Sequence, residues 1–395
     1  MGFLNRKIAL FSAVIATCTL VALAYRLPAW IRGIYPLPAL VISSVCAAGL
    51  WIFLSMQWFR LPRRVKISPV SSDPPSPYLN HQSRTPAVAY VSSADVAVLT
   101  SYFNPARYRS KLANYTRFMR PFLQSGSEVF AIECVFGDGS PELTGFPNVS
   151  TVMAESMVWQ KERLLNLLLN RIPSKYTKIV WIDCDVLFCD EQWLQKVSSA
   201  LENFPVLQPF ETAIRLPPRV TSYEGKGELF PGFGSRYALD RNCLHATEYQ
   251  SHGQTGFVWA AQREVLERCL LYDVCIAGGA DHVMVHGMCG DIDAPCVTRL
   301  LGNRSPLHEH YRRWAGRVFD MVRGRIGFVE GTILHLWHGA RTDRSYTIRN
   351  QQLNALEFDP DRDMYVGESG CWHVIRPEIE EWARAYFGSR NEDAE

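Results

Sequence analysis

Asp183 and Asp185 stand one residue apart at the end of an apolar, partly β-branched run, residues 179–182. Two carboxylates this close together repel each other unless a cation or a proton joins them. A hard divalent cation such as Mg²⁺ or Mn²⁺ prefers oxygen ligands and often bridges to the phosphates of a substrate. The pair therefore indicates a metal–diphosphate site. The structural alternative is that Asp185 caps the next segment while Asp183 forms a surface ion pair.

The chain contains other pairs of aspartates with the same spacing, and context distinguishes the first pair from them. The others are Asp291/Asp293, Asp359/Asp361 and Asp361/Asp363. None of these follows an apolar, strand-like run, and the last two lie in a polar stretch that favours a solvated turn. We therefore expect the metal chemistry at Asp183 and Asp185.

Strand-like and helix-like segments alternate around this pair. Strands are predicted at 94–102, 128–136 and 178–182, and helices after Pro105, over 158–172 and after Trp193. Such alternation is typical of an α/β protein whose mainly parallel sheet carries helices on both faces. Ligands of open parallel sheets bind beyond the carboxyl ends of the strands, where Asp183 and Asp185 stand.

The alternation fades over residues 216–254, where glycine, proline and polar residues dominate. We expect a long loop there, which either faces an acceptor or is a plain surface insertion.

Several stretches, in this order, resemble nucleotide-sugar glycosyltransferases of the GT-A fold, similar to the inverting family 2. They are VAVLTSYFNP (96–105), VFAIECVFGDGS (129–140), WQKERLLN (159–166) followed by IVWIDCDVLF, TGFVWAAQREVLERCLLYDVCIAGGADH (255–282) and HLWHGAR (335–341). Together they span about residues 94–344. The resemblance implies a Rossmann-like GT-A domain, a nucleotide-sugar donor and a divalent metal, Mn²⁺ or Mg²⁺.

The resemblance also implies a metal site. Asp185 binds the metal directly, and Asp183 holds either the metal's water or the ribose. His338 is the candidate third ligand, because imidazole also suits a Mn²⁺-type site. His335 lies three positions earlier, and positions three apart on a strand point to opposite faces, so we expect only one of the two histidines to serve. His338 is favoured because Gly339 follows it.

Asp281 is the candidate general base in an inverting transfer. It follows the sequence AGGA, which lets backbone approach a ligand closely. A carboxylate there would take the proton of the acceptor hydroxyl as that oxygen attacks the anomeric carbon. The alternative is that Asp281 caps a helix that runs through Val285.

The remaining candidates would bind substrate. The resemblance implies that Thr100 and Tyr102 line a base pocket and that Glu133 lies near the nucleoside. The other candidates, for the nucleotide-sugar, its phosphates and its sugar ring, are Lys161, Arg163, Trp259, Arg341 and Arg344. The alternatives are a solvated helix face for Lys161 and Arg163, solvated turns for the two later arginines, and a core position for Trp259.

Residues 8–25 and 37–59 carry no charge and are long enough to cross a bilayer as helices. We expect a transmembrane hairpin over 1–66, a flexible linker over 67–86, the GT-A domain over 87–345 and a C-terminal extension over 346–395. Basic residues flank the outer ends of the hairpin, which predicts an integral membrane protein with its catalytic domain in the cytosol.

The sequence thus predicts a membrane-anchored, metal-dependent glycosyltransferase with a glycan or lipid-linked acceptor. The formal net charge of +2 gives no indication of a nucleic-acid partner. One alternative is a phosphohydrolase of the haloacid dehalogenase type with Asp183 as nucleophile, although Val186 and Leu187 stand where that motif has Gly-Thr. The other is a catalytically dead, membrane-tethered binding protein.

Overall fold

Seven strands form the central sheet in the computed structural model, which describes residues 84–340, 342–344 and 346–393. These residues belong to one unit of the chain, His81–Glu395, so the predicted C-terminal extension is part of the same unit as the sheet. The predicted membrane hairpin and most of the predicted linker lie outside the described residues. Among the residues described, no helix combines the length and the apolar character needed to cross a membrane.

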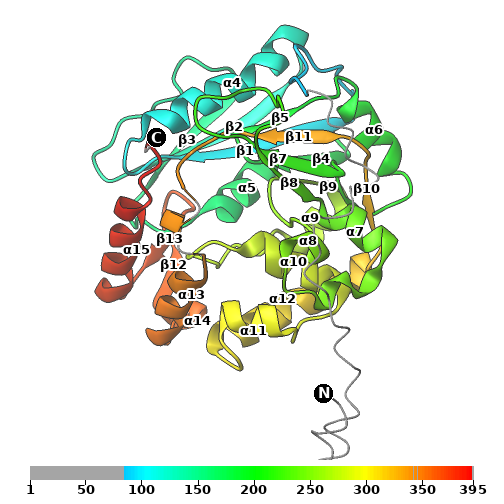
Figure 1. Ribbon diagram of the computed structural model, residues 1–395. Coiled ribbons are helices and arrows are strands. Elements are labelled where there is room, and N and C mark those ends of the chain that lie inside the picture. The colour runs from blue at the N-terminus through cyan, green and yellow to red at the C-terminus, as the bar shows by residue number, and fades with distance from the viewer. Residues whose placement is uncertain (1–83, 341, 345, 394–395) are drawn as a thin grey trace, which may run out of the picture. The chain divides into compact units, whose positions relative to one another are not determined.

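The order of the strands is β10-β6-β9-β4-β1-β2-β3 (Figure 1). Their bounds are β1 Val96–Phe103, β2 Val129–Phe136, β3 Val149–Ala154, β4 Lys178–Ile182, β6 Val206–Gln208, β9 Val258–Gln262 and β10 Ile326–Phe328. Strand β9 runs antiparallel to β4 and β6, whereas the other neighbouring pairs are parallel. The prediction of an α/β protein with a mainly parallel sheet is therefore confirmed.

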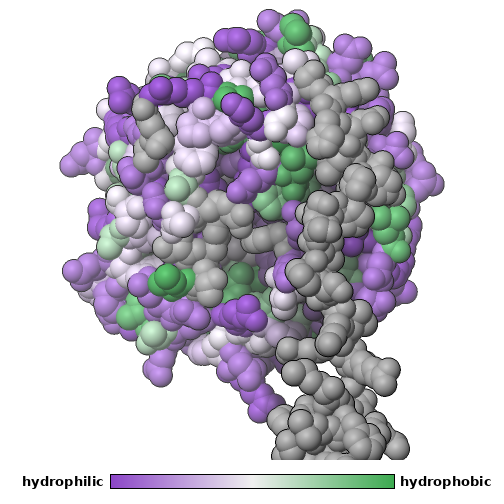
Figure 2. Space-filling view, viewed as in Figure 1, coloured by the Kyte–Doolittle hydropathy of each residue, from purple (hydrophilic) through white to green (hydrophobic). Residues whose placement is uncertain are grey.

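Helices cover both faces of this sheet. Successive residues of a strand point to opposite sides, so neighbouring positions of β1 contact different helices. Val96 and Val98 of β1 belong to the core cluster shared with α4 (Arg109–Ser125) and α6 (Trp193–Ala200). Ala97 and Leu99 belong to the cluster on the other face. That second cluster includes residues of α5 (Lys161–Leu169), α9 (Arg263–Cys269), α10 (Ala280–Cys289) and α12 (Pro306–Val322). The face drawn in Figure 2 is mainly hydrophilic, with small scattered apolar patches.

A second, four-stranded sheet supports the end of β4. It has the order β5-β11-β7-β8, with bounds β5 Val186–Phe188, β11 Thr332–His335, β7 Thr212–Arg215 and β8 Glu228–Pro231. In the antiparallel pair of β5 and β11, His335 lies opposite Val186. This register brings His335 beside Asp185, although 150 residues of sequence separate them.

The prediction of a long structureless loop over 216–254 is wrong. This segment contains β8, α7 (Phe233–Leu239), a 3₁₀ helix (Arg241–His245) and α8 (Tyr249–His252). Its aromatic residues have no regular spacing, yet Phe230, Phe233 and Tyr237 are buried. Short elements of this kind carry too few residues for a periodic pattern to show.

The remaining elements complete the C-terminal part of the unit. They are α11 Pro295–Leu301, the 3₁₀ turn Thr342–Arg344, α13 Tyr346–Ala355, α14 Pro360–Asp363, β12 Met364–Val366, β13 Trp372–Val374 and α15 Pro377–Ser389. After α15 the chain returns to α4, where the carboxylate of Asp393 accepts hydrogen bonds from the backbone N–H groups of Arg109 (3.0 Å) and Ser110 (2.8 Å). The first turn of α4 has no side-chain cap of its own, so Asp393 supplies one from the C-terminus.

Candidate active site

A cleft of about 410 Å³ opens beyond the carboxyl ends of β1 and β4. The turn that carries Asp183 and Asp185 forms its floor and is fixed by backbone hydrogen bonds on both sides. The N–H of Asp183 donates to the carbonyl of Phe257 (2.8 Å), and the carbonyl of Asp185 accepts from the N–H of Leu336 (2.9 Å). Two separate sheets therefore hold this turn in position.

Asp185 meets two histidines in the cleft. Its Oδ2 lies 3.0 Å from His338 Nε2, and its Oδ1 lies 3.7 Å from His335 Nε2. The two imidazole Nε2 atoms are 3.1 Å apart, and one ligand atom from each of the three residues falls within 4.8 Å of the others. We call Asp185, His335 and His338 the Asp–His cluster.

The expectation that only one of the two histidines would serve is not what the geometry shows. Strand β11 ends at His335, so the alternation of side chains stops there. His338 follows in irregular backbone, and Gly339 next to it adopts φ +92°, a conformation that favours glycine. The chain therefore turns back and brings both imidazoles to Asp185.

The Asp–His cluster fits a divalent cation. Among the residues that the structure describes, none donates a hydrogen bond to the buried Oδ1 atom of Asp185, which is a costly state for a carboxylate oxygen. Burial would raise the pKa of Asp185, but the neighbouring imidazoles, His338 first, outweigh burial and hold this pKa below its usual range. Burial also lowers the pKa of His335 well below its usual value, which keeps its imidazole neutral and able to ligate. One carboxylate and two imidazoles suit Mn²⁺ better than Mg²⁺, which takes oxygen ligands.

Lys161 joins the other two carboxylates of the cleft. Its Nζ lies 2.7 Å from Asp183 Oδ1 and 3.0 Å from Asp281 Oδ2. Burial would lower the pKa of Lys161, but the charges of Asp183, Asp281 and Glu162 raise it well above its usual value. Burial raises the pKa of Asp183 to about 6, with Asp281 and Asp185 adding to the rise and Lys161 opposing it. The ammonium group of Lys161 thus links Asp183 to the candidate base, Asp281.

Basic side chains surround these groups. Among the described residues that line the cleft, seven are lysines or arginines and three are acidic, the acidic ones being Asp183, Asp185 and Asp281. The basic ones are Lys111, Lys161, Arg215, Arg299, Arg344, Arg349 and Arg390. An excess of cationic groups in one cleft favours a ligand with several negative charges, and guanidinium groups match phosphate oxygens in geometry.

The C-terminal tail reaches the same site. Glu392 is almost fully buried, with its Oε2 3.7 Å from His338 Nδ1 and 3.8 Å from Lys111 Nζ. Arg390 pairs with the same carboxylate (2.5 Å). Burial would raise the pKa of Glu392, but Lys111, Arg390 and His338 hold it below its usual range. The tail therefore adds a buried carboxylate and a guanidinium group to the surroundings of His338.

Among the predicted site residues, the structure brings Lys161, Asp183, Asp185, Asp281 and His338 together in the cleft. It does not bring Thr100 and Tyr102 there. Both point away from the cleft, and Ser101 and Phe103, on the other face of β1, line it instead.

Thr100, Tyr102 and Glu133 have structural partners. Thr100 donates to the carbonyl of Ile182 (2.8 Å), and Tyr102 donates to Glu142 (2.9 Å). The carboxylate of Glu133 accepts from the backbone N–H groups of Glu142 (2.5 Å) and Leu143 (3.2 Å). Tyr102 and Glu133 therefore hold the loop that follows β2 in position.

Arg163 and Trp259 are structural as well. Arg163 donates to the carbonyl of Gly370 (2.6 Å), pairs with Asp273 (3.4 Å) and lies over the ring of Trp372. Trp259 lies in β9 opposite Trp181, inside the core, and its indole N–H donates to a backbone carbonyl (2.7 Å). Arg341 lies outside the described residues. Arg344 reaches the cleft, where its Nη2 lies 2.7 Å from His338 Nε2.

Sequence reasoning missed several members of the site. The expected site favours His338 over His335 and does not include Lys111, Arg215, Arg349 and Arg390. The sequence gives only a weak indication that Lys111 belongs to the site, because this residue lies on the polar side of an expected helix. The others come from irregular segments or from the C-terminus, and no local pattern marks them.

No family model matches the chain, and no curated protein matches it. Among solved structures, the chain is similar to glucosyl-3-phosphoglycerate synthase from Mycobacterium tuberculosis in complex with Mg²⁺ and uridine diphosphate. The identity is 14% and the TM-score 0.35, over 71% of this chain and 87% of that chain. It is also similar to mannosyl-3-phosphoglycerate synthase from Rubrobacter xylanophilus, with 12% identity and a TM-score of 0.34 over 73% and 88% of the two chains.

A third similar structure is a mutant of β-1,4-galactosyltransferase 7 from Drosophila in complex with manganese, UDP-Gal and xylobiose. Here the identity is 12% and the TM-score 0.31, over 73% of this chain and 98% of that chain. The similarity to nucleotide-sugar glycosyltransferases that the sequence predicted is thus found in the structure.

Proposed function

We propose that this protein is a metal-dependent glycosyltransferase that moves a sugar from a nucleoside diphosphate-sugar to an acceptor hydroxyl, with inversion. One observation supports this best. A single cleft combines the Asp–His cluster, an excess of basic side chains and a separate carboxylate, Asp281, at the N-terminus of α10. In a transfer from a nucleotide-sugar, a cation at the Asp–His cluster would bind the diphosphate and the basic side chains would stabilise the charge of the leaving group. The separate carboxylate would activate the acceptor hydroxyl.

Asp185, His335 and His338 would hold the cation. A divalent ion bound there supplies Lewis-acid stabilisation of the departing diphosphate. Lys111, which lies near Glu392 beside this cluster, and the cleft arginines would bind the remaining phosphate charge. These charged groups come from separate segments of the fold and are already in place before the donor arrives. An active site uses charges positioned in this way to stabilise the charge that develops in the transition state.

Asp281 would act as the base. In the transfer, the acceptor oxygen forms a bond to the anomeric carbon as the bond from that carbon to the diphosphate oxygen breaks. The hydroxyl proton passes to the Asp281 carboxylate, and the electron pair of the broken bond leaves with the diphosphate. Lys161 would keep Asp281 in position and balance its charge beside Asp183.

Location and acceptor are parts of the same proposal. The uncharged runs at 8–25 and 37–59 would anchor the chain in a membrane with the cleft on the cytosolic side, and the acceptor would be a glycan or a lipid-linked glycan. No described residue bears on either point, and both rest on the sequence.

The test uses the full-length chain, incubated with a panel of UDP-, GDP- and other nucleotide-sugars with Mn²⁺, with Mg²⁺ or with a chelator. Free nucleoside diphosphate is followed, and donor binding is measured in parallel by calorimetry. We expect one donor to bind and to be hydrolysed or transferred slowly with Mn²⁺, and Asp185→Asn to abolish this. If no donor binds with either metal, the proposal fails.

The two alternatives give different results in the same assay. A phosphohydrolase with Asp183 as nucleophile would release inorganic phosphate and form an aspartyl-phosphate. Asp183 is already engaged by Lys161 at 2.7 Å, which does not favour that role. A dead binding protein would bind a donor without turnover at any metal concentration.

A further inference from the structure

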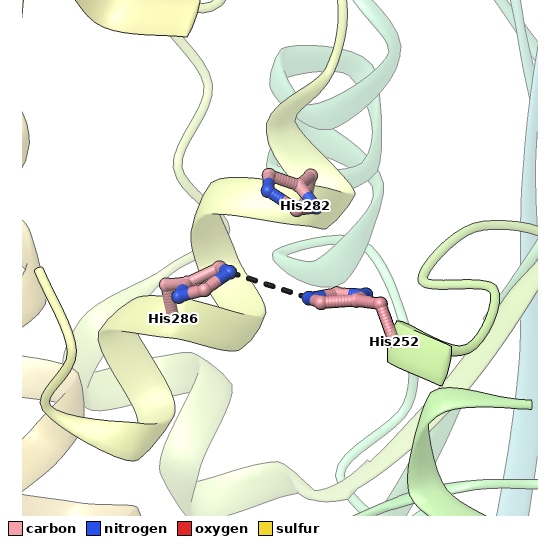
Figure 3. Close-up of side chains that lie close together, drawn as sticks. All are labelled: His252, His282 and His286. Carbon is pink, nitrogen blue, oxygen red and sulfur yellow. Dashed lines mark hydrogen bonds between the residues drawn. The ribbon is translucent and has the colours of Figure 1, made fainter. Parts of the chain in front are cut away.

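Three histidines outside the Asp–His cluster lie close together, and two of them, His252 and His282, line the cleft. His282 and His286 stand one turn apart on α10, and His252 ends α8 (Figure 3). The ring centroids are 4.8 to 5.5 Å apart, and one nitrogen from each ring lies within 4.8 Å of the others. We call these residues the His cluster. The function proposed above does not use it.

The polar atoms around the His cluster indicate which of its nitrogens carry protons. Nδ1 of His252 lies 3.0 Å from the carbonyl of Gly253, and only a protonated Nδ1 can donate to it. Nδ1 of His286 lies 3.5 Å from Oδ2 of Asp291, and a proton on this nitrogen would face the carboxylate. With both protons on Nδ1, both Nε2 atoms carry lone pairs, and these two atoms lie 3.4 Å apart.

Two lone pairs at this distance repel each other unless a proton or a metal cation lies between them. Moving the proton of His286 to Nε2 would satisfy His252 but would turn an Nδ1 lone pair toward the Asp291 carboxylate. Both of those atoms are buried, and neither has a hydrogen-bond partner of strict geometry among the residues that the structure describes. Either a second proton on His286 or a metal ion between the Nε2 atoms would satisfy all these groups, and the metal ion does so with both imidazoles neutral.

The separation of the Nε2 atoms of His252 and His286 suits a small tetrahedral ion. Zinc–imidazole bonds of about 2.0–2.1 Å at tetrahedral angles place neighbouring ligand nitrogens about 3.3 Å apart. The observed separation of the two Nε2 atoms is 3.4 Å. The contacts of Nδ1 to a carboxylate and to a backbone carbonyl are those that orient zinc-binding histidines and fix their tautomers.

We propose that His252, His282 and His286 form a second metal site, which takes one ion of the Zn²⁺ class and fastens α8 to α10 beside Asp281. Three imidazoles without a carboxylate favour zinc over the oxygen-seeking cations Mg²⁺ and Ca²⁺. A fourth position remains for a water or another donor, and Cys296 Sγ lies on this side, 3.3 Å from His286 Nε2. Because His282 directly follows Asp281, the ion would position the candidate base.

The experiment measures metal binding, so it does not depend on the proposed transferase activity. The full-length chain is stripped with a chelator, and Asp185→Asn and His338→Gln are introduced together to disable the Asp–His cluster. Zn²⁺ binding is titrated by calorimetry, and Co²⁺ is used as a visible probe of tetrahedral geometry. His286→Gln and His252→Gln are then added singly, with His310→Gln as the matched control. His310 is a half-buried histidine on α12 that belongs to neither cluster.

We expect the background protein to bind one equivalent of Zn²⁺ with micromolar or tighter affinity and to give a tetrahedral Co²⁺ spectrum. His286→Gln and His252→Gln should each weaken binding by at least about 100-fold, and Asp291→Asn by about 10- to 100-fold. His310→Gln should change nothing. Circular dichroism checks folding. His252 lies on a four-residue helix, so it still provides a test if His286→Gln does not fold.

Two results would overturn the proposal. One is a background protein that binds no Zn²⁺ at micromolar concentration. The other is Zn²⁺ binding that survives both His286→Gln and His252→Gln. Either result would leave the proposed function standing, because that function rests on the Asp–His cluster.

Discussion

The two clusters of the cleft are built in different ways. The Asp–His cluster joins one carboxylate to two imidazoles, and its members come from the end of β4 and from the segment that leaves β11. The His cluster has three imidazoles, two of them one helical turn apart on α10. The donor atoms therefore differ, and so does the cation that each cluster favours: Mn²⁺ for the first and Zn²⁺ for the second.

The two clusters would also have different roles, one in the chemistry of the transfer and the other in positioning the base. The Asp–His cluster lies among basic side chains that would bind a diphosphate, and it would act on the leaving group. The His cluster lies next to Asp281 and would act on the acceptor side by fixing the base. Four substitutions, in order of decreasing expected effect, test this division.

Asp185→Asn should have the largest effect. It removes the charged oxygen of the Asp–His cluster, and metal stabilisation of a leaving diphosphate contributes several kcal/mol, so we expect turnover to fall by about 10³-fold or more. Activity in wild type should be higher with Mn²⁺ than with Mg²⁺. Steady-state rates with each metal measure both effects. Equal activity with and without chelator would break the assignment of this cluster to catalysis.

Lys161→Met should come next, because Lys161 is the link between the two sides of the cleft. Without its ammonium group, Asp183 and Asp281 repel each other and tend to share a proton, which removes an ionised base. Loss of general-base function corresponds to about a 10²-fold drop in kcat. The matched control is Lys196→Met, since Lys196 pairs with Asp190 in a half-exposed position and should leave kcat unchanged.

His252→Gln should have a smaller and more selective effect. If the His cluster only positions Asp281, donor affinity should stay the same, while kcat with acceptor falls by about tenfold, since a shift of the base of a fraction of an ångström is costly. Calorimetry of donor binding and rates with acceptor separate the two quantities. A loss of donor binding would show that the two clusters do not divide the work as we infer.

Asp393→Ala should affect stability rather than chemistry. It removes the cap that the C-terminal tail gives to α4, which costs about 1 kcal/mol. In a unit of this size we expect Tm to fall by less than about 4 °C. Thermal unfolding measures this, with the exposed turn residue Asp138 as control in Asp138→Ala. A large loss of activity at unchanged Tm would instead place the tail in the chemistry of the Asp–His cluster.

The sequence by itself predicted the alternation of strands and helices, the mainly parallel sheet and the importance of Asp183 and Asp185. These follow from local patterns, because burial on both faces makes a strand of a parallel sheet continuously apolar, and polar residues at its carboxyl end stand out. Asp281 could be found for a similar reason, since its glycine-rich approach is local. The His282–His286 spacing was also visible in the sequence, but its meaning depends on a third ligand.

Only the tertiary structure decided which side chains meet. Every residue of β1 is buried or nearly so, and the sequence therefore could not show that Ser101 and Phe103, rather than Thr100 and Tyr102, face the cleft. The register of β5 and β11 brings His335 to Asp185, and the return of the C-terminus brings Arg390 and Glu392 to His338. These contacts join segments far apart in the chain, where local spacing carries no information, and the packing of the whole unit fixes them.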